Sequence, residues 1–222
     1  MPHTYEYPHP AVTTDAVIFT VRGWRLEVLL IRRGHPPYEG RWAFPGGFLD
    51  YDEGLAACAA RELKEETGIS GVRLEQFHAA GTPGRDPRER NISILHLGLV
   101  ADGQVEPQAG DDAAAVGWFD ARRPPPLAFD HSELLALARE HLAIRIRTTN
   151  AALDLLPRCF TRADLAAVLA AVNAAQSPPG RMLRIWMATG LVKPVAERVG
   201  GRRLYRKAGQ RTVRKSRARR RP

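Results

Sequence analysis

The sequence has few cysteines and no long hydrophobic run. Its 222 residues include two cysteines, Cys58 and Cys159, which lie far apart and belong to no paired spacing typical of a zinc site or redox motif. The opening MPHTYEYPHPAV lacks the basic and apolar regions of a secretory leader, and no apolar run reaches the roughly 18 residues of a membrane span. We therefore expect reduced thiols in a cytoplasmic protein without a membrane segment.

Charge is divided unevenly along the chain. Residues 1–150 hold 16 Lys and Arg against 21 Asp and Glu, whereas residues 151–222 hold 17 against 3, for a formal net charge of +9. With 44% hydrophobic and 26% charged residues, the chain has the composition of a folded protein. An acidic body joined to a strongly basic end indicates two modules, the second with a polyanionic partner. A single domain with a solvated basic tail has the same composition.

The acidic half has the pattern of an α/β fold. Short apolar runs at Ala16–Thr20 and Leu26–Ile31 flank the segment Arg22–Gly23–Trp24, and this pattern predicts a hairpin. Further along, Ile92–Val100 is expected to be a strand and Ser132–Ala143 a helix. Strands alternating with helices are typical of a sheet covered by helices.

A helix is expected over Leu55–Thr67, ended by Gly68. Its Glu62, Glu65 and Glu66 stand at positions i, i+3 and i+4, so the three carboxylates share one stripe. Like charges at this spacing destabilise a helix by a few tenths of a kcal/mol per pair. Mg²⁺ or Mn²⁺ compensates for such crowding, and a solvated acidic face is the alternative. The seven histidines form no metal-like cluster. The residues expected on the buried face are Ala56, Ala59, Ala60, Leu63 and Thr67.

These glutamates belong to the longer pattern Gly47-x5-Glu53-x7-Arg61-Glu62-Leu63-x-Glu65-Glu66-x-Gly68-Ile69. The stretch resembles the signature of the Nudix hydrolases at every specified position. The resemblance implies an α/β/α sandwich on a mixed sheet, with divalent metal held against a diphosphate. By motif position it implies the catalytic residues: Glu62, Glu65 and Glu66 as metal ligands, Arg61 orienting the carboxylates, and Glu53 assisting in the metal shell. Which glutamate acts as the base stays open.

The loop from Gly81 to Ser93 contains Arg85, Arg88 and Arg90, and arginine suits phosphate recognition. Its Asp-Pro-Arg element looks like that of Nudix proteins acting on ADP-ribose, so we expect a nucleoside diphosphate sugar as ligand. The expected substrate-binding residues are Arg41, Gly46, Gly47, Arg85, Asp86 and Arg88. Ala115 stands where many active relatives carry a glutamate, which leaves the rate of hydrolysis open; Asp111 or Asp112 is the candidate replacement.

The basic end has the pattern of a winged helix-turn-helix. A basic hairpin with Gly200–Gly201 at its turn follows three expected helices. In such a module the last helix enters the major groove of DNA. An interaction module or a helical cap is the alternative. The expected helices span residues 150–156, 162–174 and 178–190, and the strands span 194–199 and 202–207. The expected DNA-binding residues are Arg181, Arg184, Arg202, Arg203, Arg206 and Lys207.

Two segments, Leu155–Leu165 and Gly201–Arg206, are similar to the C-terminal module of Nudix-related transcriptional regulators of NAD metabolism. The resemblance implies a homodimer that senses ADP-ribose in the Nudix pocket and binds double-stranded DNA. We expect a Nudix domain at 1–146, a winged-helix domain at 147–209, and a disordered basic tail at 210–222 that contacts phosphates or only aids solubility. The alternative function is a plain Mg²⁺-dependent ADP-ribose-type pyrophosphohydrolase whose C-terminal domain only dimerises or docks.

Overall fold

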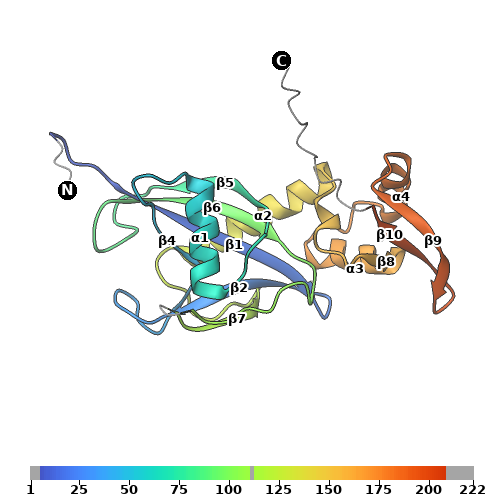
Figure 1. The fold of residues 1–222 in the computed structure, drawn as a ribbon, viewed down its shortest axis with the longest axis horizontal. Helices are drawn as coiled ribbons and strands as arrows, with labels where there is room; N and C mark the ends of the chain where they lie inside the picture. Colours follow the sequence, from blue (N-terminus) through green and yellow to red (C-terminus); the bar gives the residue numbers. More distant parts are fainter. Residues whose placement is uncertain (1–5, 111–112, 209–222) are drawn as a thin grey trace, which may run out of the picture.

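In the residues that the computed structural model describes, 6–110 and 113–208, a seven-stranded mixed sheet and a three-stranded sheet form the framework (Figure 1). Over these ranges, no helix has both the length and the hydropathy needed to span a bilayer. In chain order the elements are β1 (Ala11–Arg22), β2 (Arg25–Arg33), β3 (Trp42–Ala43), β4 (Gly46–Phe48), α1 (Leu55–Thr67), β5 (Leu74–Ala80), β6 (Asn91–Leu99), β7 (Ala113–Asp120), α2 (His131–Thr148), the 3₁₀ turn η1 (Ala151–Leu153), β8 (Cys159–Thr161), α3 (Arg162–Ala171), α4 (Pro179–Ala188), β9 (Val192–Val199) and β10 (Arg202–Lys207).

Strand β1 is the central element of the larger sheet. It pairs antiparallel with β2 beside their connecting turn, antiparallel with β4 near its start, and parallel with β6, so the sheet is mixed. At the turn, Gly23 and Trp24 have φ of 53° and 65°, the left-handed geometry of a two-residue hairpin loop. The expected hairpin is confirmed, and both strands extend beyond the apolar runs that predict it.

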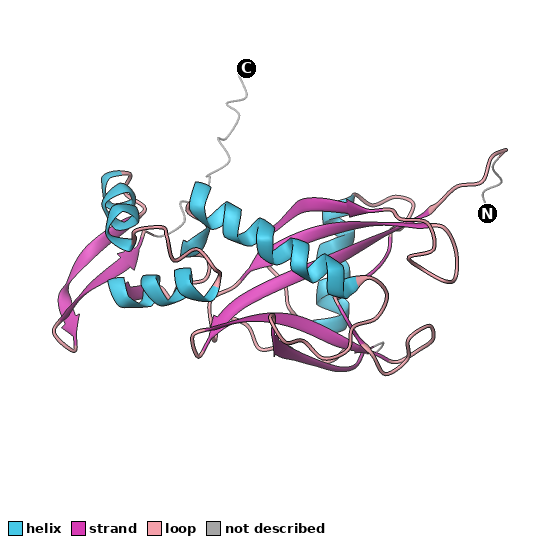
Figure 2. Ribbon diagram, turned by 180° about the vertical axis from the view of Figure 1, so that it is seen from behind, coloured by secondary structure: helices cyan, strands magenta, loops and turns pink. Residues whose placement is uncertain are grey.

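The buried side chains of β1 alternate between two helices on opposite faces of the sheet. Ala16 and Ile18 pack with Leu63 of α1, whereas Val17 and Phe19 share a core with α2. Helix α1 crosses the front of the sheet in Figure 1, and α2 lies along the other face, which is turned forward in Figure 2. The expected α/β/α sandwich on a mixed sheet is confirmed.

Helix α1 begins and ends at the predicted residues, and Gly68 follows it with φ of 70°. Its buried face differs from the prediction, because Ala56 and Ala60 are exposed and Cys58 is fully buried. The Thr14 hydroxyl donates to Cys58 Sγ at 3.2 Å, and burial raises the pKa of this thiol to about 11. Alanine is small enough for a buried or an exposed position, so the spacing of the alanines did not determine which face of the helix is buried. The buried residues of α1 are Cys58, Ala59, Leu63 and Thr67.

The C-terminal part contains two helices and a hairpin. Helix α3 begins with a capping box, in which the Thr161 hydroxyl accepts from Asp164 N–H and the Asp164 carboxylate accepts from Thr161 N–H. Gly200 and Gly201, with φ of 55° and 75°, form the expected turn between β9 and β10. The helix expected over 150–156 is only the short turn η1, and β8, which pairs with β10, was not predicted.

The two parts of the chain share one apolar core. Helix α2 continues to Thr148, so the expected boundary between residues 146 and 147 falls inside a helix. The cluster of buried side chains that includes Leu142 of α2 extends to Phe160 and Trp186 in the C-terminal part. The winged-helix elements therefore pack directly against the end of the sandwich and are not separated from it by a flexible linker (Figure 1).

Polar contacts also cross this junction. Lys207 Nζ of β10 donates to the carbonyl oxygens of Leu153 and Leu156, at 2.8 and 2.6 Å. Arg122, which follows β7, donates from Nη2 to the carbonyl oxygen of Ala171 at 3.3 Å. The Ala171 carbonyl is at the C-terminal end of α3, where such groups lack intrahelical partners. The Arg122 contact holds α3 against the sandwich, and the Lys207 contacts hold the wing against the segment that follows α2.

We expect Leu142→Ala to lower the free energy of unfolding by about 2–5 kcal/mol, because it leaves a cavity in the shared core. Chemical denaturation followed by circular dichroism measures the change. The control is Leu137→Ala on the exposed side of the same helix, expected to change stability by about 0.5 kcal/mol or less. Equal stability of the two variants would contradict a structural role for the core at α2.

Candidate functional site

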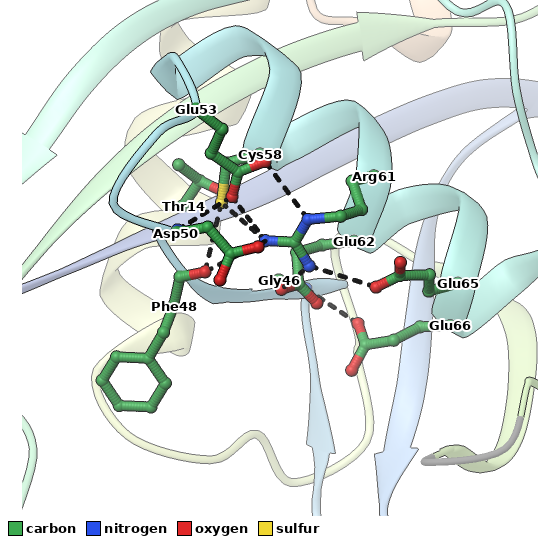
Figure 3. Close-up of polar contacts among 10 residues, drawn as sticks. All are labelled: Thr14, Gly46, Phe48, Asp50, Glu53, Cys58, Arg61, Glu62, Glu65 and Glu66. Atoms are coloured by element: carbon green, nitrogen blue, oxygen red, sulfur yellow. Dashed lines mark hydrogen bonds and ion pairs between the residues drawn. The ribbon is translucent and has the colours of Figure 1, made fainter. Parts of the chain in front are cut away.

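The side chain of Arg61 lies at the centre of a group of carboxylates (Figure 3). Its guanidinium donates to Glu53 Oε1 at 2.5 Å, to Glu62 Oε1 at 2.7 Å and to Glu65 Oε2 at 3.1 Å. The hydrogen bond from Arg61, together with one from the backbone N–H of Asp50, lowers the pKa of Glu53 to about 2. The arginine of the motif therefore orients three carboxylates at once.

Glu66 is partly buried and contacts the backbone of β4 (Figure 3). It accepts a hydrogen bond on Oε2 from Gly46 N–H at 2.8 Å. Burial, together with the charges of Glu62 and Asp15, nevertheless raises the pKa of Glu66 to about 8. Burial also raises the pKa of Glu62. Two neighbouring carboxyl groups that resist ionisation form a site where a bound cation stabilises the charged form.

A close approach between β4 and α1 depends on two glycines. A Cβ atom at Gly47 would lie 2.3 Å from Glu62 Oε1, and one at Gly46 would lie 2.2 Å from the carbonyl oxygen of Thr14. Any other residue at these positions would push the strand away from its neighbours. The glycine pair thus places its backbone directly against the carboxylates of the helix.

The donors on α1 fit a hard divalent cation. They are carboxylate oxygens, which Mg²⁺ and Mn²⁺ prefer. Within residues 6–110 and 113–208, no group of three or more His, Cys, Asp or Glu side chains is already arranged as a metal site. Glu62 and Glu65 would therefore exchange contacts with Arg61 for contacts with the cation.

A cavity of about 190 Å³ lies beside the glycine pair. The predicted substrate residues Arg85, Asp86 and Arg88 line it together with Gly46 and Gly47. The structure thus brings most of the predicted substrate set to one place. The sixth member, Arg41, is not among the lining residues, and its Nη1 donates to the carbonyl oxygen at position 127 at 3.5 Å. Aromatic side chains complete the wall: Phe44, Phe48 and Phe129.

Two arginines of the substrate loop are paired with carboxylates. Arg85 donates from Nε and Nη2 to the two oxygens of Asp130, at 2.9 and 2.7 Å. Arg88 donates to both oxygens of Asp86, at 3.0 and 2.7 Å, and lies over the ring of Phe48 at 5.2 Å. Bidentate pairs of this kind are strong and directional, so the loop is rigid around the cavity.

Sequence reasoning missed three titratable residues that line the cavity, namely Asp15, Arg33 and His131. Asp15 directly precedes the buried apolar run Ala16–Phe19 of β1, and a carboxylate in a buried strand is a signal of function. Burial lowers the pKa of Arg33, whose guanidinium lies over the Phe129 ring at 5.0 Å. His131 is the first residue of α2 and carries no local signal, since its neighbours across the cavity are distant in sequence.

Position 115, where many active relatives carry a glutamate, is an alanine here. Ala115 lies in β7 and pairs with Arg32 of β2. Asp111 and Asp112, the candidate replacements, fall outside the described residues. The carboxylates of the motif that the structure describes are therefore those on α1 together with Glu53.

The C-terminal part presents basic side chains to solvent. The exposed ones that the sequence predicts for DNA contact are on α4 and β10: Arg181, Arg184, Arg202, Arg203 and Arg206. Lys207 differs from its neighbour Arg206, because successive residues of a strand point to opposite sides. It is half-buried at the junction with the sandwich, and burial lowers its pKa. The tail at 210–222 lies outside the described residues.

Comparison with known proteins finds relatives of the sandwich and of the whole chain. The family model described as NUDIX domain matches residues 10–138. The ADPR responsive transcriptional repressor NtrR of Acinetobacter baylyi is 34% identical over 213 residues, which cover 92% of this chain and 85% of the repressor. The ADP-ribose pyrophosphatase of Methanocaldococcus jannaschii is 38% identical over 129 residues, which cover 58% of this chain and 73% of the pyrophosphatase.

A solved structure matches both parts of the fold. The crystal structure of Shewanella oneidensis NrtR complexed with a 27mer DNA is similar with a TM-score of 0.69 and 28% sequence identity, covering 89% of this chain and 93% of that chain. The structural similarity therefore includes C-terminal elements as well as the sandwich. Since the NUDIX model spans more than half of the sequence and the repressor is related along nearly all of it, the chain belongs to the Nudix family.

Proposed function

We propose that this chain is an ADP-ribose-responsive transcriptional regulator that binds DNA and also hydrolyses the diphosphate of its ligand. One observation carries the proposal: a complete Nudix acidic set beside a cavity shares a core with a module that exposes arginines on a helix and a hairpin. The relatives support it, since NtrR is named as ADPR responsive and NrtR was crystallised with DNA. We propose that the Nudix domain includes the whole of α2, to Thr148, and that the winged-helix elements follow it.

Hydrolysis rests on the residues of α1 and the loop before it. We propose that Glu62, Glu65 and Glu66 hold Mg²⁺ or Mn²⁺, which when bound supplies neutralisation of the diphosphate charge. Arg61 keeps the carboxylates oriented, and one of the glutamates takes the proton of the attacking water. Addition of that water across the phosphoanhydride splits ADP-ribose into AMP and ribose 5-phosphate.

The cavity suits the ligand that the relatives indicate. Arg88 presents a guanidinium between the rings of Phe48 and Phe129, at 5.2 and 5.8 Å from their centres, and its side chain is 40% exposed. A guanidinium at the cavity mouth attracts phosphate oxygens, and aromatic faces accept a stacked purine. An anionic nucleotide therefore finds both kinds of contact in one place.

DNA binding rests on the exposed arginines. We propose that α4 enters the major groove with Arg181 and Arg184, and that Arg202, Arg203 and Arg206 of the wing contact the phosphate backbone. A homodimer would present two such modules to the two half-sites of an operator.

Helix α2 connects the two sites. Its first residue, His131, lines the cavity, and the preceding Asp130 is held by Arg85. Its far end leads into η1, whose Leu153 carbonyl accepts from Lys207 of the wing. A ligand that changes the contacts of Arg85 therefore acts on the start of a rigid element whose end supports the DNA-binding module.

The alternative is a plain ADP-ribose-type pyrophosphohydrolase whose C-terminal part only dimerises or docks. The similarity to the M. jannaschii pyrophosphatase, which covers 58% of this chain, favours this alternative for the sandwich taken alone. It leaves the exposed arginines of α4 and β10 without a role.

A gel-shift series tests the proposal against this alternative. The duplexes come from the region upstream of the chain's own gene cluster, and an unrelated duplex of equal length measures non-specific binding. We expect a preferred duplex whose affinity changes at least about tenfold when ADP-ribose is added, a coupling within the usual range. Equal affinity for all duplexes, with and without ADP-ribose, would reject the regulator in favour of the hydrolase.

Arg184→Ala should weaken binding to the preferred duplex by about 1–3 kcal/mol and change non-specific binding much less, because α4 is proposed to contact base edges. Fluorescence anisotropy with both duplexes at several salt concentrations measures the two effects. Arg147→Ala, an exposed arginine at the end of α2, is the matched control. Equal losses on both duplexes would place Arg184 on the backbone instead.

Glu65→Gln should reduce Mg²⁺-dependent release of AMP from ADP-ribose by roughly 10²-fold or more, because it removes a proposed metal ligand, and Glu66→Gln should do the same. Chromatographic separation of AMP at fixed times measures the rate. Glu140→Gln, on the exposed side of α2, is expected to keep the parent rate. Unchanged turnover in both motif variants would reject the metal assignment.

A further inference from the structure

Two buried polar side chains face each other in the cavity and belong neither to the Nudix motif nor to the arginine loop. Asp15 comes from β1 and His131 from the start of α2, and both line the cavity. They are 8% and 3% exposed. Placing a carboxylate and an imidazole in such a position is costly unless both are hydrogen-bonded, so the pair requires an explanation.

The tautomer of His131 is fixed by the backbone. Phe44 N–H donates to His131 Nδ1 at 3.1 Å, and the two rings stack with their centres 4.6 Å apart. Burial lowers the pKa of His131, so the ring is neutral. With Nδ1 accepting a hydrogen bond, the proton of the neutral ring is on Nε2. The ring therefore presents an N–H donor in a fixed direction.

The carboxylate of Asp15 is held in an equally defined position. Its Oδ2 accepts a short hydrogen bond from Ser93 Oγ. Its Oδ1 lies 3.8 Å from His131 Nε2, which is too long for a hydrogen bond. A Cβ atom on Gly46 would come within 2.8 Å of this Oδ1, so the glycine keeps the backbone clear of it. A donor and an acceptor thus face each other without satisfying one another.

The negative charge of Asp15 determines which ligand groups can bind between Asp15 and His131. A phosphate oxygen is an acceptor with negative charge, so the Asp15 carboxylate repels it. A hydroxyl group can accept from His131 Nε2–H and donate to Asp15 Oδ1 at the same time. In a nucleoside diphosphate sugar, the groups that meet this requirement are the hydroxyls of its riboses.

We propose that Asp15 and His131 clamp a ribose hydroxyl of the ligand and so make the cavity selective for ribose-bearing diphosphates. Ser93 is a positioning residue, because it holds the carboxylate that contacts the hydroxyl. The inference rests on the proposed nucleotide ligand and deepens it, since it names two residues that recognise the sugar rather than the phosphates.

The test is calorimetric titration of the full chain and of Asp15→Asn with three probes: ADP-ribose, ADP and inorganic pyrophosphate. EDTA is present, so metal-dependent turnover does not run. Asparagine has the shape of aspartate and can still accept from Ser93, but it carries no charge. We expect it to weaken ADP-ribose binding roughly tenfold or more, because a hydrogen bond to a charged group is lost. Pyrophosphate should bind equally well or more tightly, because a negative charge has left the cavity.

ADP identifies which ribose is held. A loss for ADP-ribose alone assigns the clamp to the terminal ribose, and a loss for both ligands assigns it to the ribose of adenosine. Ser93→Ala should produce a smaller loss with the same ligand pattern. The matched control is Asp52→Asn, an exposed aspartate outside the cavity, which should leave all three affinities unchanged. Thermal unfolding of each variant verifies that it is folded.

Two outcomes overturn the clamp. One is wild-type affinity of Asp15→Asn for ADP-ribose, and the other is an equal loss for pyrophosphate and ADP-ribose, which would mean a general effect on the cavity. If the unaltered chain binds ADP-ribose, the proposed function keeps its ligand whichever way the variant behaves. Failure of the unaltered chain to bind ADP-ribose overturns both.

Discussion

The site depends on how closely strand β4 approaches the carboxylates of α1. Gly46 and Gly47 have no side chains, so the backbone of β4 reaches within contact distance of Glu62 and donates to Glu66. On the other side of Glu62, Arg61 gathers the remaining carboxylates into one group. In an isolated helix, repulsion between carboxylates at this spacing would lower the stability of the helix. The packing of helix against strand concentrates these carboxylates beside the cavity, where the proposed cation would neutralise them.

The second constraint is that the sandwich and the winged-helix elements are built around one core. Helix α2 contributes buried residues to the face of the sheet opposite α1, and the same cluster continues into the C-terminal part. Lys207 of the wing donates to a carbonyl of η1, and Arg122 of the sandwich donates to a carbonyl of α3. The proposed regulation requires that a change at the ligand site alter the position of the DNA-binding elements. The contacts at this junction provide that connection.

Much of this structure was predictable from local patterns. The bounds of α1, the glycine that ends it and both tight hairpin turns follow from short segments whose chemistry requires a particular backbone. The acidic set was predictable because the motif is continuous in sequence. The comparisons confirm the Nudix family and the sandwich that the motif implied.

Other features depend on contacts between distant segments. Strand β8 forms because β10 pairs with it, and a segment of three residues is too short for its sequence pattern to predict a strand. Lys207 faces inward because of the register of β10, which composition does not reveal. Asp15 and His131 are separated by most of the sandwich in sequence and meet only when β1 and α2 are folded. Ala56 and Ala60 are exposed although their spacing predicted burial, because small residues tolerate both environments.

The shared core has a consequence for how such chains are related by descent. A module attached through a flexible linker can be gained or lost when recombination breaks the gene within the linker. Here a cut after α2 would uncover Phe160 and Trp186 on one piece and the apolar end of the sandwich on the other. Transfer of this C-terminal part to another Nudix domain would therefore require compensating substitutions on the newly exposed apolar surface. The two parts are expected to have been inherited together as one unit.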